Sequence, residues 1–73
     1  MRIFKEGDKV KYSRDFLRST GQITGDVPFA KGVVMDVAPM GDRQLVTIDF
    51  DLIGRMRVLN SNLVMVGQME VER

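Results

Sequence analysis

The stretch from residue 30 to residue 51 constrains the fold of this chain more than any other. Two runs rich in β-branched residues, 30–37 and 44–51, flank a cluster of Pro, Gly and Asp at 38–43. Such a pattern is typical of a β-hairpin. In the second run Val46, Ile48 and Phe50 alternate with residues of the opposite face, which indicates a sheet with one buried and one solvated side. A slip of one residue would bring a carboxylate into the core, so the alternation also fixes the register.

The chain before this hairpin contains one short strand and one long loop. Residues 1–6 are a lead-in whose Ile3 and Phe4 are expected to cover one end of the core. Residues 9–12 follow a Gly-Asp turn and alternate as a strand. Residues 13–29 lose that alternation, and a segment of this length in a small domain usually carries local structure or function.

A helical turn is expected within the long loop. Asp15 is placed to cap a turn through residues 16–20, which Gly21 can end in a left-handed conformation. Phe16 and Leu17 are expected to pin the loop to the sheet. Residues 24–28 contain Gly, Asp and Pro and form a second turn that leads back into the sheet.

Two further strands are expected after the hairpin. Gly54 closes a short connection, and residues 55–59 then alternate with Met56 and Val58 pointing inward. Residues 60–62 read Asn-Ser-Asn, which suits one turn of 3₁₀ helix because these side chains bond to nearby backbone. Residues 63–66 form the last strand.

The pattern predicts an all-β fold, a five-stranded SH3-like barrel with a long loop after the first strand and a 3₁₀ turn before the last. A five-stranded OB-type barrel is the alternative. Residues 1–66 are assigned to the barrel and residues 67–73 to a C-terminal tail, of which Met69 and Val71 could extend the last strand. For residues 33–37 the opposite phase stays open. The predicted core is Val10, Val34, Val46, Ile48, Phe50, Val58 and Leu63.

Composition removes several function classes. The chain of 73 residues has no cysteine and no histidine, so it lacks disulfides, thiolate metal sites and the usual general base. We therefore expect no catalytic residues, no metal and no cofactor. No apolar run approaches the length of a membrane span, and no signal peptide is visible, so a cytoplasmic protein is expected.

Three family resemblances follow from the order of these motifs. Residues 7–11, Gly-Asp-Lys-Val-Lys, with Lys-Gly-Val-Val at 31–34, resemble the KOW element, in which two such strands bracket a loop that often touches RNA. The order of elements is also similar to the type II dihydrofolate reductases, small SH3-like tetramers. Their Val-Gln-Ile-Tyr pore strand corresponds here to residues 56–59, Met-Arg-Val-Leu, so their activity is not expected. Most of the chain resembles small proteins of phages and bacterial mobile elements.

Charge is distributed unevenly despite a formal net charge of +1. Residues 1–31 carry seven Lys and Arg against four acids, and residues 32–73 carry four against six. Phosphates need cations at high local density, and Tyr12 or Phe16 is a candidate to stack on an unpaired base. The alternative is that such cations keep a small barrel in solution and protect its strand edges. The candidate nucleic-acid contacts are Lys9, Lys11, Arg14, Arg18, Lys31, Arg55 and Arg57.

Acidic and methionine residues suggest weaker candidates. The acids Asp36, Asp42, Asp49 and Asp51 lack a glycine-bounded ligand loop, so pairing with Arg55 or Arg57 is favoured over Ca²⁺ or Mg²⁺ binding. Met35 and Met56 are expected to fill gaps in the core. The candidate interface residues are Met40, at the hairpin tip, and Leu59 and Val64.

These observations indicate a non-catalytic binding module. The favoured function is weak association with nucleic acid through the basic loop face. The alternative is a module for protein interaction or homo-oligomeric assembly that uses strand edges. No membrane and no small-molecule cofactor is expected as a partner in either case.

Overall fold

A computed structural model describes residues 3–22 and 24–67 of the chain. It contains β1 (Lys9–Tyr12), α1 (Arg14–Ser19), the 3₁₀ helix η1 (Val27–Phe29), β2 (Lys31–Met40) and β3 (Arg43–Phe50). β4 (Gly54–Leu59), the 3₁₀ helix η2 (Asn60–Asn62) and β5 (Leu63–Met65) follow. The expected C-terminal tail lies outside the described residues apart from Gly67.

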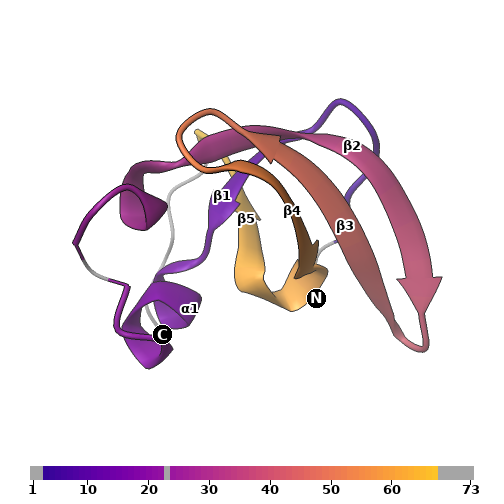
Figure 1. Ribbon diagram of the computed structural model, residues 1–73. Helices are drawn as coiled ribbons and strands as arrows, with labels where there is room; N and C mark the ends of the chain where they lie inside the picture. The colour runs from indigo at the N-terminus through magenta and orange to yellow at the C-terminus, as the bar shows by residue number, and fades with distance from the viewer. Residues whose placement is uncertain (1–2, 23, 68–73) are drawn as a thin grey trace.

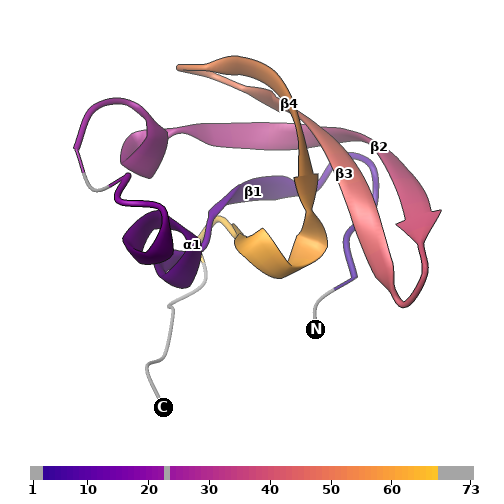
Figure 2. The ribbon, with the colours of Figure 1, turned by 60° about the horizontal axis from the view of Figure 1, so that its bottom comes forward.

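The five strands form one antiparallel sheet in the order β4-β3-β2-β1-β5. The sheet curls around its buried face without closing (Figure 1). The far end of the β2–β3 hairpin and α1 lie at opposite sides of the molecule (Figures 1 and 2). The all-β prediction with five strands is therefore confirmed, together with the 3₁₀ turn before the last strand.

The central hairpin has the predicted buried face on its second strand but a shorter turn than expected. Gly32 lies opposite Phe50 at one end and Met40 opposite Arg43 at the other, with a bulge at Met35. Only Gly41 and Asp42 form the turn, and Gly41 takes a positive φ of 64°. A glycine first in a two-residue loop suits the twist of a hairpin.

Pro39 belongs to β2, which corrects its assignment to the turn. It pairs in register with Gln44, on a part of β2 that β1 does not reach because β1 pairs only with residues 31–33. Proline lacks an N–H and is tolerated where a strand edge is free. Its presence therefore blunts this edge against pairing with another chain.

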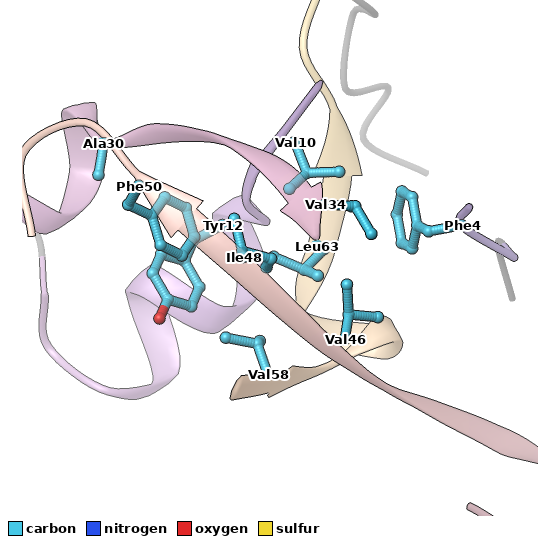
Figure 3. Close-up of a cluster of buried hydrophobic side chains, with 10 residues drawn as sticks. All are labelled: Phe4, Val10, Tyr12, Ala30, Val34, Val46, Ile48, Phe50, Val58 and Leu63. Atoms are coloured by element: carbon cyan, nitrogen blue, oxygen red, sulfur yellow. The ribbon is translucent and has the colours of Figure 1, made fainter. Parts of the chain in front are cut away.

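The core consists of the side chains on the concave face of the sheet (Figure 3). All seven predicted core residues are buried in one cluster, and Val34 has the predicted phase. Phe4 joins the cluster at the end opposite Tyr12 and Phe50, whereas Ile3 is 68% exposed, so only half of that expectation holds. The other additional members are Tyr12 and Ala30.

Met35 and Met56 do not fill the core as predicted. Met35 is 44% exposed because it follows the buried Val34, so the alternation of β2 places it on the outer face, where the bulge leaves it without a partner in β3. Met56 lies opposite Ile48 on the inner side of the sheet, yet it is 39% exposed. The reason is its position on β4, the last strand of the sheet, where no neighbouring strand covers it.

The side chain of Gln44 holds the N-terminal segment to the sheet through hydrogen bonds to the main chain of Phe4. The amide oxygen of Gln44 accepts from the N–H of Phe4 at 2.8 Å, and its Nε2 donates to the Phe4 carbonyl at 3.2 Å. The buried Asn60 in turn accepts from the N–H of Gln44 at 3.1 Å through Oδ1. The side chain of Asn60 therefore accepts a hydrogen bond from β3, whereas the sequence predicted bonds to the main chain close to Asn60.

Helix α1 has a different N-cap from the one predicted. The hydroxyl of Ser13 accepts from the N–H of Phe16 at 3.1 Å, and Asp15 lies within the first turn. Gly21 ends the helix as expected, with a φ of 73°. The N–H of Gln22 donates to the carbonyl of Leu17 at 2.9 Å, which is the bond of a Schellman motif.

Candidate functional site

Three lysines gather on the outer face of the sheet, the side turned away from the core. Lys9 and Lys11 alternate with the buried Val10 on β1, so both point outward. Lys31 begins β2 and lies directly opposite Lys11 in the antiparallel register. We call Lys9, Lys11 and Lys31 the lysine cluster.

An open groove of about 280 Å³ lies beside the lysine cluster. Lys9 and Lys31 line it together with Gly32, Val33 and Val66. Val33 is paired with Lys9 and is 38% exposed, and Val66 donates its N–H to the carbonyl of Lys9 at 2.9 Å. The groove thus lies between two lysine side chains and has an apolar floor.

The pairing of Lys11 with Lys31 is electrostatically unfavourable in the isolated molecule. Directly opposite residues of an antiparallel pair have Cβ atoms about 4.5–5.5 Å apart, and like charges there destabilise the sheet. Asp51 is the nearest acid in the ladder, where its Oδ1 accepts the main-chain N–H of Lys31 at 3.0 Å, so its charge offsets part of this repulsion. An anion between the two ammonium groups would remove their repulsion.

The other basic candidates lie in two separate groups. Arg14 and Arg18 are on α1, which follows β1 at one end of the sheet (Figure 2). Arg55 and Arg57 are on β4, separated from β2 by the whole of β3. Their spacing in the sequence gave no indication of this separation, because it depends on the order of the strands.

Tyr12 is not available for stacking on a base, which corrects one expectation. Its ring stacks with Phe16 at a centroid distance of 4.5 Å and with Phe50 at 5.1 Å, and the residue is buried. Burial also raises the pKa of its hydroxyl above the ordinary value of 10.0. Phe16 is itself half-buried against the core, and with Leu17 it pins α1 as predicted.

The acidic residues do not converge on one point. Asp49 lies opposite Arg55 in the ladder, which is the favoured cross-strand pairing, and Asp36 lies opposite Thr47. Asp42 is at the hairpin turn. Within residues 3–22 and 24–67, no group of three or more acidic side chains is arranged to hold a metal ion.

The candidate interface residues differ in exposure. Met40 is 51% exposed at the end of β2, as expected for a residue near the hairpin tip. Leu59 and Val64 are half-buried on the outer face, where they lie opposite Leu45 and Lys11 respectively. Met40 is therefore the most accessible of the three.

Sequence reasoning missed the groove residues Gly32, Val33 and Val66. The only sequence signal for Val33 was its phase. It alternates with the predicted core residue Val34 and so was expected on the outer face. The groove depends on β1 lying between β2 and the end of β5, and that neighbourhood arises from pairings between distant segments.

The geometry defines a small all-β protein with a lysine-lined groove on the outer face of an open antiparallel sheet. Comparison of the chain with protein-family models, with curated proteins and with solved structures finds no match. No helix in the described part of the chain has the length and apolar character needed to cross a membrane.

Proposed function

We propose that this protein is a non-catalytic binding module of the SH3-like barrel type that associates weakly with nucleic acid through the lysine cluster. The observation that carries the proposal is the direct opposition of Lys11 and Lys31 beside Lys9 and an open groove. The position of β5 beside β1 after a 3₁₀ turn supports the barrel type. The proposed compartment is the bacterial cytoplasm, in keeping with a phage or mobile-element protein.

The binding expected from this surface is weak, tolerant of sequence and strongly dependent on salt. Its affinity would come from a few phosphate contacts, each of which releases counterions. Tyr12 is buried and contributes no base stacking. An apolar groove floor beside the ammonium groups accommodates the less polar parts of a strand.

A pair of double variants tests the proposal at matched net charge. K11Q/K31Q should weaken binding of single- and double-stranded oligonucleotides at about 50 mM salt and lower the salt slope by about one unit per lost contact. K5Q/R43Q changes the net charge equally at exposed positions outside the cluster and should leave binding nearly unchanged.

The fold offers an internal control for the same experiment. K11Q/K31Q removes a like-charge pair. Its free energy of unfolding should therefore stay the same or rise by about 0.2–1 kcal/mol. Equal weakening by both double variants would contradict a specific site. Absence of binding by the wild-type chain would contradict the proposal itself.

The second candidate function is protein interaction or self-assembly. It is favoured by the free edge of β4 and by apolar side chains exposed on the surface, among them Met40 and Met56. Sedimentation over a range of protein concentrations tests it directly. If oligonucleotides do not bind, this candidate takes the place of the first.

A further inference from the structure

β4 offers a free edge that includes the main-chain hydrogen-bonding groups of two arginines. Among residues 3–22 and 24–67, β4 is paired on one side only, with β3. Val34 exchanges main-chain hydrogen bonds with Gly7 and Asp8 on the β1 side, so Val33, the residue before it, directs its main-chain groups toward Asp49 of β3. Ile48 lies opposite Val34, so its main-chain N–H and C=O also point away from the β2–β3 ladder. They point toward Met56 on β4. The main-chain groups of Arg55 and Arg57 consequently face the open edge.

The two faces of β4 differ sharply in chemistry at this edge. Arg55 and Arg57 are exposed on the outer face, and Arg57 lies opposite Thr47, so the residue across the ladder provides no acid for it. Met56 lies between them on the inner face and is 39% exposed. A strand added here would complete the edge if it carried acids on one face and an apolar residue on the other.

A second copy of β4 does not fit this edge. An antiparallel β4–β4 pair centred on residues 55–57 and keeping like faces together would place arginine opposite arginine. Like charges directly opposite each other destabilise a sheet. The arginines therefore exclude this form of self-pairing and select for an acidic strand.

The chain itself carries the complementary pattern near its end. Residues 69–72 read Met-Glu-Val-Glu, which alternates apolar and acidic side chains with the same period as β4. They lie outside the described residues. We propose that residues 69–72 of a second copy add to the free edge of β4 as an antiparallel strand. In that register Glu70 lies opposite Arg57, Glu72 opposite Arg55, and Val71 opposite Met56.

The position of β5 favours a second copy as the source of this strand. β5 is bonded to β1 at the opposite end of the strand order, and Val66 remains tied there by its N–H bond to Lys9. Residue 69 is only three positions further along the chain. An exchange in which each copy supplies a strand to the other gives a closed two-fold dimer and caps both free edges.

Charge reversal and mixing test the proposal, with sedimentation equilibrium as the measurement. The full chain should dimerise with a dissociation constant at or below about 1 mM, the range expected of a short added strand, and more weakly at high salt. R55E/R57E alone and E70R/E72R alone should be monomeric, because each opposes like charges. An equimolar mixture of the two should form a heterodimer, since each tail then meets the opposite charge on its partner.

Two controls keep the proposal falsifiable. R55K/R57K retains the charges and should retain the dimer, and a peptide of residues 66–73 in excess should dissociate the wild-type dimer. E70R/E72R changes no residue of the described sheet, so its loss of dimer reports on the contact and not on folding. A wild-type chain that stays monomeric at about 1 mM, or a mixture without heterodimer, would overturn the proposal. These measurements contain no nucleic acid, so they are independent of the proposed function.

Discussion

At the scale of single residues, Gly32 is a position on β2 where the neighbouring β3 leaves no room for a side chain. A Cβ at this position would lie 2.6 Å from Cγ2 of Ile48 and 2.7 Å from the carbonyl oxygen of Asp49. One of these atoms is main chain and cannot rotate away. Gly32→Ala should therefore lower the free energy of unfolding by about 1–3 kcal/mol, as overpacking of a core does. Chemical denaturation measures the loss, and Val33→Ala, on the exposed face beside it, should cost less.

Tyr12 makes stability depend on pH in the alkaline range. Burial raises the pKa of the folded hydroxyl above 10.0, so between that value and the folded pKa the unfolded chain binds fewer protons than the folded one. Stability is then fully present below about pH 10 and decreases as pH rises above it. Thermal melts from about pH 8 to 11 should show this decrease in the wild type. It should be smaller in Tyr12→Phe, which removes the chain's single tyrosine.

At the scale of elements, α1 depends on its caps because six residues are too few for a helix to persist alone. Ser13 satisfies the first turn, and the bond from Gln22 to Leu17 satisfies the last. Ser13→Ala should lower stability by about 1 kcal/mol, whereas Ser13→Asp should largely preserve it. Denaturant melts compare these with Asp15→Ala, which should cost less because Asp15 is not the cap. A larger loss for Asp15→Ala would contradict this assignment.

At the scale of the whole molecule, stability rests on one small core. Ile48 is fully buried at its centre, between β2 and β4 in the register. Ile48→Ala should cost about 2–5 kcal/mol through lost burial and a residual cavity. A domain of this size has few kcal/mol to lose, so the variant should be partly unfolded at 37 °C. A two-state melt measures the change, and Leu52→Ala, at a residue 51% exposed, is the matched control.

The alternation of apolar residues allowed much of this architecture to be read from the sequence. The phase of residues 46–50 predicted the buried face of β3, and the Asn-Ser-Asn run predicted η2. The expectation that both methionines fill the core failed at Met35 because alternation after the buried Val34 places it on the outer face, and at Met56 because the sheet ends at β4. Whether an inward-pointing residue is covered depends on its neighbours in space.

The basic residues show the same division most clearly. The sequence by itself determined that Lys9 and Lys11 share a face, because side chains alternate along any strand. Only the tertiary structure decided that Lys31 lies opposite Lys11. It also decided that Arg55 and Arg57 lie at a free edge on β4, two strands from Lys31 in the sheet. Local alternation follows from backbone geometry within a few residues. Strand order depends on which distant segments bury their apolar faces together.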